Sequence, residues 1–302
     1  MAPPNSGPLD AALQYQGQSA PSICPSLSSV AKVRACVNGA IAEQKAMFTS
    51  FQVSEDDLQT IVAFLQGREY KQIRITCSDD YNLILRFMPG FTHGAMVQTL
   101  TYMIVSALTA SPHLPPGFHV LSHVVIAGGA TVQLNFEHKR YKEPDQSFYP
   151  GEDFSWPLVV IEIGVAEALR ELETDARHWL SHTPVLNMVI LMTIGPQVAV
   201  PDIDELPVPC INIIHYEKVV STNDRNTGPQ VEVRKTFEKS WTAREVISDY
   251  CLPLRYFFLE GSPRHQALQL LEGDPQIVVP LKEILVLRGI IRDSWHRRPA
   301  CG

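Results

Sequence analysis

Two acidic residues in the middle of the chain have the chemistry of a metal site. Asp145 follows Pro144, and sixteen residues separate it from Glu162, which lies inside the apolar run 158–165. A carboxylate in a buried strand costs free energy unless it is paired, protonated or bound to a cation. If the two acids lie side by side on neighbouring strands, their oxygens suit Mg²⁺ or Mn²⁺. Such ions activate water and neutralise charge on a scissile phosphate.

Basic residues precede the first acid, in the cluster Lys139, Arg140 and Lys142. Such a cluster is usually a solvated face, although beside a nuclease site it could guide a phosphate backbone. Lys142 reaches the acids only if its side chain faces inward. The ordinary alternative for Glu162 is a structural ion pair with Arg86 or Lys142.

The order and spacing of these residues resemble the PD-(D/E)XK nuclease superfamily, specifically its Uma2-like branch and uncharacterised fungal relatives. The resemblance covers residues 72–194. Pro144-Asp145 matches the PD element, and Glu162 matches the acid of the second half-motif. It implies a restriction-endonuclease-like α/β core, with a mixed central sheet flanked by helices. It also implies a divalent-metal-dependent nuclease acting on DNA or RNA, with Asp145 and Glu162 as ligands of Mg²⁺ or Mn²⁺.

One position departs from the family pattern. Gly164 stands where the family has its lysine, two residues after the acid. In some branches this role moves to the following helix, which here offers Asp175, Arg177 and His178 but no lysine. Arg177 is a weak substitute, because a guanidinium is always protonated and differs in geometry from an ammonium. The candidate catalytic residues are therefore Asp145, Glu162, Lys142 and Arg177.

Three neighbours have a plainer expected role. We expect His93 to be a polar residue at a helix start rather than a catalyst. Asp175 and Trp179, one helical turn apart, occupy the place where related nucleases carry a polar-and-aromatic pair beside the site, and Trp179 is expected in the core.

The missing lysine keeps two other functions open. One is a pseudo-nuclease, which no longer cuts and serves as a binding module for nucleic acid or protein. The other is a scaffold that self-associates as a homo-oligomer and whose carboxylates are structural, because a fold does not fix a function.

Hydrophobic periodicity predicts the elements that position these residues. We expect helices at 29–48 and 54–67, a β-hairpin of strands 72–77 and 81–87, and a core helix at 93–108. Strands are expected at 119–126, 131–136 and 142–148. The buried strand 158–165, the helix 167–181 and the strand 185–194 predict a crossover unit with parallel strands.

The C-terminal part has a looser pattern. We expect strands at 210–216 and 230–237, a short helix from Thr242 through Tyr250, short segments at 254–259 and 276–279, and a packed element at 281–291. The expected organisation is a disordered tail at 1–28, a core at 29–200 and a C-terminal, β-rich extension at 201–302 packed on that core.

Bulk properties exclude several classes. The net charge of −7 and a pI of 5.8 argue against a protein that coats nucleic acid electrostatically. Six scattered cysteines without a CxxC pair indicate reduced thiols. The chain shows no secretory signal and no apolar run of the ~20 residues that a bilayer needs, so we expect no membrane partner and a cytoplasmic or nuclear location. Motifs of serine hydrolases, Walker NTPases, dinucleotide-binding enzymes and zinc proteases are absent.

Overall fold

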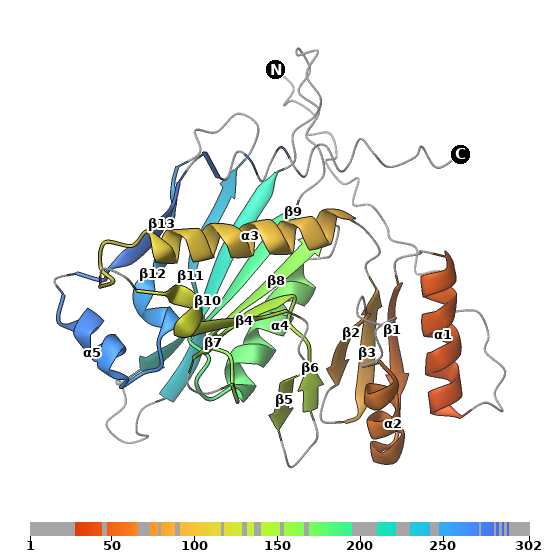
Figure 1. Cartoon of the computed structure of the whole chain (residues 1–302). Helices are drawn as coiled ribbons and strands as arrows, with labels where there is room; N and C mark the ends of the chain where they lie inside the picture. Colours follow the sequence, from red (N-terminus) through yellow and green to blue (C-terminus); the bar gives the residue numbers. More distant parts are fainter. Residues whose placement is uncertain are drawn as a thin grey trace, which may run out of the picture.

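The computed structural model describes residues 28–43, 47–65, 73–77, 80–87, 91–115, 118–128, 132–135, 140–151, 154–165, 169–194, 210–221, 230–241, 248–271 and 273–280, with 282, 283, 286 and 289. Within this part of the chain the fold is mixed α/β, with two larger sheets and one two-stranded sheet (Figure 1). The predicted tail at 1–28 lies outside the described residues, apart from Ser28.

The smaller of the two larger sheets has five strands in the order β1-β3-β2-β6-β5, all antiparallel. Its strands are β1 (Met47–Gln52), β2 (Ile73–Cys77), β3 (Asn82–Phe87), β5 (Val132–Asn135) and β6 (Arg140–Lys142). Helices α1 (Ser29–Glu43) and α2 (Glu55–Leu65) cover one face. The Ser54 hydroxyl accepts a hydrogen bond from the N–H of Asp57 at 3.1 Å, so Ser54 is the N-cap that the sequence indicates.

Side-chain alternation gives the β2–β3 hairpin two different faces. One face packs with α1 and α2 in a separate core that includes Ile73, Ile75, Leu83 and Leu85. Because successive residues of a strand point to opposite sides, the intervening residues of β2 and β3 face away from these helices. That second face is turned toward the larger sheet (Figure 1).

The larger sheet has six strands in the order β11-β10-β9-β8-β7-β4. They are β4 (Val124–Ala127), β7 (Gln146–Pro150), β8 (Val159–Val165), β9 (Met188–Ile194), β10 (Ile211–Ser221) and β11 (Gln230–Trp241). Strands β8 and β9 are parallel and joined through α4 (Leu169–His182), which confirms the predicted crossover unit. The other pairings are antiparallel.

Helices cover both faces of this sheet. Helix α3 (Phe91–Thr109) crosses one face, where its residues Met96 and Leu100 share a core with Ile161 and Ile163 of β8 (Figure 1). Helix α4 covers the other face, where a second core includes Val160. A continuous apolar run suits β8 because both of its faces are buried.

The chain passes from one sheet to the other between Lys142 and Gln146. Lys142 ends β6, which pairs with β2, and Gln146 begins β7, which pairs with β8. The single strand predicted at 142–148 is therefore wrong. Pro144 lies at this break and lacks the N–H that would donate a ladder hydrogen bond inside a paired strand.

Other boundaries also differ from the sequence prediction. The helix predicted at 29–48 ends at Glu43, and Met47 begins β1, where pairing with β3 outweighs the apparent helical spacing. The strand predicted at 119–126 is a 3₁₀ turn (η2, Val120–Ser122) followed by β4. The helix predicted through Tyr250 is wrong at its end, since Tyr250 begins β12, and residues 242–247 lie outside the described part.

Strands β10 and β11 continue the larger sheet beyond β9, with longer spans than predicted. The final elements are β12 (Tyr250–Pro253), the 3₁₀ turn η3 (Leu254–Phe257), α5 (Pro263–Gln269) and β13 (Gln276–Val279). Leu252 and Ile277, from β12 and β13, join the same core as α3, so this segment packs on the larger sheet's α3 side. Most of the element predicted at 281–291 lies outside the described residues.

Candidate active site between the two sheets

Strand register places the two candidate acids next to each other. In the antiparallel pair β7–β8, Gln146 lies opposite Ile161, so the preceding residue, Asp145, lies level with Glu162. The N–H of Ile163 donates to Oδ2 of Asp145 at 2.7 Å, which fixes this carboxylate against β8. The juxtaposition that the sequence suggested for Asp145 and Glu162 is therefore present.

Glu162 lies on the α4 side of β8. Its neighbours along the strand, Ile161 and Ile163, belong to the α3 core, so alternation directs Glu162 to the opposite face. There the indole N–H of Trp179 donates to Oε1 of Glu162 at 2.6 Å. Trp179 is fully buried as expected, and this hydrogen bond is a contact that sequence periodicity did not reveal.

A third acid, Asp175, joins the pair from α4. Oδ1 of Asp175 lies 2.8 Å from Nζ of Lys142, and its Oδ2 lies 2.6 Å from Nη1 of Arg86. Lys142 Nζ also lies 3.9 Å from Oε1 of Glu162. The sequence offered Arg86 or Lys142 as an ion-pair partner of Glu162; the structure brings Lys142 to it and pairs Arg86 with Asp175.

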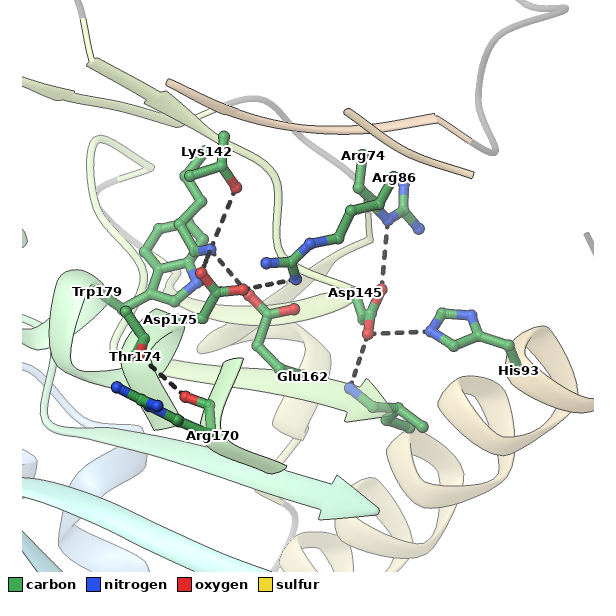
Figure 2. Close-up of polar contacts among 12 residues, drawn as sticks. Arg74, Arg86, His93, Lys142, Asp145, Glu162, Arg170, Thr174, Asp175 and Trp179 are labelled. Carbon is green, nitrogen blue, oxygen red and sulfur yellow. Dashed lines mark hydrogen bonds and ion pairs between the residues drawn. The ribbon is translucent and has the colours of Figure 1, made fainter. Parts of the chain in front are cut away.

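Two further groups contact Asp145. Arg74 Nε lies 3.3 Å from Oδ1 of Asp145, and His93 Nε2 lies 3.0 Å from Oδ2 (Figure 2). His93 lies in the first turn of α3, as expected, and additionally contacts an acid. We call the whole set the charge cluster: Arg74, Arg86, His93, Lys142, Asp145, Glu162 and Asp175.

The charge cluster lies where the two sheets meet. Its fixed cations, Arg74, Arg86 and Lys142, come from β2, β3 and β6 of the five-stranded sheet. Its acids come from the start of β7, from β8 and from α4 of the larger sheet. Figure 2 shows the side chains converging from these two directions.

The two central acids have opposite electrostatic environments. Burial disfavours the charge of Asp145, but His93, Arg74 and the N–H of Ile163 outweigh it and lower the pKa of Asp145 to about 2. Burial dominates for Glu162, and the charges of Asp145 and Asp175 add to it. Together they raise the pKa of Glu162 to about 8, although Lys142 opposes the shift. The surroundings therefore favour the charged form of Asp145 and the neutral form of Glu162.

The surroundings of Asp145 and Glu162 affect whether these two residues can bind a divalent cation. Among the described residues, no group of three or more His, Cys, Asp or Glu side chains is arranged to hold a metal. Mg²⁺, however, is commonly held by one or two carboxylates together with water and substrate phosphates. Burial is the first cause of the raised pKa of Glu162, and a bound cation would oppose that effect. Asp145 and Glu162 provide two carboxylates level with each other on neighbouring strands.

The remaining candidates lie elsewhere. Arg177 is exposed, and its guanidinium lies 5.4 Å from the ring centroid of Tyr216, so the structure does not bring it to the acids. His178 packs edge-on against His182. Lys139 lies outside the described residues, as does the side chain of Arg140.

Sequence reasoning missed Arg74 as a member of the charge cluster. The signal was available in part, since the β2–β3 hairpin was predicted and alternation separates Arg74 from the apolar residues beside it. What was missing was the position of this hairpin relative to the larger sheet.

No family model matches the chain, and no curated protein matches it in sequence. None of the helices in the described part of the chain combines the length and hydropathy needed to cross a bilayer.

Proposed function

We propose that this chain has a restriction-endonuclease-like core and is a divalent-metal-dependent nuclease that hydrolyses phosphodiester bonds of DNA or RNA. Support comes from the sequence order of Asp145 and Glu162, their position side by side on adjacent strands, and the parallel β8-α4-β9 crossover.

One observation carries the proposal: a lysine reaches the acids from outside the expected motif position. Gly164 provides no ammonium two residues after Glu162, but Nζ of Lys142 lies 3.9 Å from Oε1 of Glu162. Lys142 comes from β6, three residues before Asp145 in the sequence. The two acids and a lysine therefore come together, but the lysine precedes the PD element in the sequence instead of following Glu162.

The roles of the residues follow from their contacts. Asp145 and Glu162 would hold Mg²⁺ or Mn²⁺, which supplies charge neutralisation at the phosphate and activation of water. Lys142 places a positive charge beside Glu162, and Asp175 fixes that ammonium through the 2.8 Å ion pair. Trp179 orients Glu162 through its indole N–H. Arg177 has no role in this arrangement.

The test is a cleavage assay with Mn²⁺ on single- and double-stranded DNA and RNA. We expect cutting by the wild-type protein and its loss in Asp145→Asn and Lys142→Met. Asp274→Asn is the matched control, because Asp274 forms its ion pair with Arg255 outside the charge cluster. Cutting that persists at the wild-type rate in Asp145→Asn would refute the site assignment.

A second candidate function is a pseudo-nuclease that binds nucleic acid without cutting it. The observation that favours it is the internal pairing of the acids, since Asp145 and Asp175 each contact two basic side chains. No cutting under any condition, together with retained binding of an oligonucleotide, would establish this alternative.

A further inference from the structure

Arg74 and Arg86 lie directly opposite each other on adjacent strands. They are register partners in the β2–β3 hairpin and share the face that points away from α1 and α2. Like charges in directly opposite positions destabilise a sheet unless something compensates them. Here each guanidinium meets an acid of the other sheet, Asp145 for Arg74 and Asp175 for Arg86.

Two arginines and a histidine are the most exposed side chains of the charge cluster. The side chains of Arg74, His93 and Arg86 are 26%, 16% and 14% exposed, whereas those of Asp145, Glu162 and Asp175 are 6–7% exposed. Lys142 is the most buried, at 2%. A molecule that approaches from solvent therefore meets the arginines and the histidine before it meets the acids, an order that favours an anion.

The contact between Arg74 and Asp145 is a weak one for an ion pair. The Nε–Oδ1 distance is 3.3 Å, whereas charge-assisted hydrogen bonds are typically about 2.7–2.9 Å. A guanidinium presents a planar fork of donors that matches two oxygens of a phosphate. Exchange of the long contact with Asp145 for a phosphate would therefore give Arg74 a closer anionic partner. It would also remove one cation from Asp145.

We propose that Arg74, with Arg86 and His93 beside it, binds a backbone phosphate of a nucleic acid at the more exposed side of the charge cluster. This inference rests on the proposed function, for which it names the residue that contacts the substrate backbone. In the structure described above, Asp145 takes the place of the phosphate as the partner of Arg74. Arg86 is the more buried of the two arginines and adds a second positive charge from the adjacent strand.

The test measures binding separately from cleavage. Fluorescence anisotropy of a labelled oligothymidylate is recorded in EDTA over a series of KCl concentrations. We expect Arg74→Gln to weaken binding by about tenfold, as for loss of one charged hydrogen bond. We also expect it to reduce the slope of log K against log salt by about 0.7, the value for one phosphate contact with a single strand. Inorganic phosphate, compared with KCl at equal ionic strength, serves as a competitor.

Two variants make the result specific. Arg234→Gln on β11 removes the same charge from an exposed arginine that pairs with Glu232, and we expect wild-type affinity and slope. Arg74→Lys keeps the charge but not the fork, so we expect an unchanged slope and an intermediate affinity. If thermal melting shows that Arg74→Gln does not fold, the affinity and slope of Arg74→Lys are compared with those of the wild type instead.

The outcomes separate this inference from the proposed nuclease activity. Wild-type affinity and slope in Arg74→Gln would overturn the inference even if the protein cuts DNA. The inference would also fall if the wild-type protein did not bind the oligonucleotide, or if inorganic phosphate displaced it no more strongly than KCl does at equal ionic strength. Reduced affinity and slope in Arg74→Gln would support it even if no cleavage is found.

Discussion

The ammonium of Lys142 lies 2.8 Å from the carboxylate of Asp175, and both side chains are almost completely buried. Lys142 also hydrogen-bonds to the hydroxyl of Thr76 at 3.4 Å, and its Nζ lies 5.6 Å from the ring centroid of Trp179. Because Lys142 belongs to the five-stranded sheet and Asp175 to α4, this ion pair joins the two halves of the fold. Its energetics can be measured directly.

We predict that Lys142→Met and Asp175→Asn each lower the free energy of unfolding by about 3–5 kcal/mol, because each leaves a buried charge without its main partner. The double variant should cost less than the sum of the two, with a coupling of roughly 1–3 kcal/mol. Urea denaturation of the four proteins gives these values. Strict additivity would show that the two groups do not interact energetically.

An exposed ion pair provides the control for this comparison of single and double variants. Lys235 and Glu238 lie 2.9 Å apart, nearly the same distance, but their side chains are 39% and 49% exposed. Lys235→Met and Glu238→Gln should change stability by no more than about 0.5 kcal/mol each.

Trp179→Phe should destabilise the protein more than Trp241→Phe does. Both tryptophans are fully buried, but only the indole of Trp179 donates a hydrogen bond, to Glu162. The indole nitrogen of Trp241 has no hydrogen-bond partner among the described residues. Both changes lose similar volume, so we expect the difference in unfolding free energy to be about 1–3 kcal/mol, the cost of an unmade buried hydrogen bond. Equal losses of unfolding free energy in the two variants would show that the hydrogen bond from Trp179 to Glu162 does not stabilise the protein.

Addition of Mg²⁺ or Mn²⁺ should raise the melting temperature of the wild-type protein. A metal concentration of about one hundred times Kd adds roughly 2.7 kcal/mol of stability. We expect this response to disappear in Asp145→Asn and Glu162→Gln while both variants stay folded, and to persist in Asp274→Asn. A metal response that is unchanged in both site variants would contradict the assignment.

The metal response should also depend on pH. Because the pKa of Glu162 is raised to about 8, this carboxyl is protonated below that pH and must lose its proton to bind a cation. Affinity for the metal should therefore rise as the pH increases toward about 8 and then level off. Titrations of the melting temperature at several pH values measure this dependence. An affinity that falls over this range would contradict the role of Glu162.

A buried histidine far from the charge cluster should govern part of the acid sensitivity. Burial lowers the pKa of His215 from 6.5 to about 3, and its Nε2 lies 2.6 Å from the hydroxyl of Tyr250. As the pH falls from 6.5, the unfolded chain binds a proton that the folded protein does not, so stability decreases, by up to about 1.4 kcal/mol per pH unit. His215→Gln cannot titrate, and urea unfolding should show a flatter dependence over this range. An equally steep dependence in the variant would show that other groups cause it.

Much of the large sheet could be predicted from the sequence. The apolar run at β8 and the helical stripe of α4 are strong local patterns, and a helix between two buried strands implies a parallel pair. The strand β1 was missed because Met47 continues an apparent helical spacing. Only its pairing with β3, a contact distant in sequence, defines it as a strand.

The candidate site could be predicted in part. Glu162 is conspicuous because an acid inside an apolar strand requires a partner, and Asp145 was found through its spacing from it. Lys142 and Asp175 were also found from the sequence, because Lys142 precedes the PD element and Asp175 lies one helical turn from Trp179. Arg74 belongs to a hairpin whose placement against the larger sheet depends on contacts distant in sequence, which no local pattern encodes. Arg177 lies on the exposed side of α4, whereas Asp175 and Trp179 lie on its buried side.

The passage of the chain from β6 to β7 has a consequence for the biosynthesis of this protein. The five-stranded sheet is assembled from two stretches, 47–87 and 132–142, and the elements between them, α3 and β4, belong to the other half. A nascent chain that has emerged only as far as β3 presents the edge of β2 without its neighbour β6. Such an unpaired edge is a template for association with other chains. Fragments cut near residue 90 should therefore aggregate, and co-expression of the two fragments should restore solubility by strand complementation.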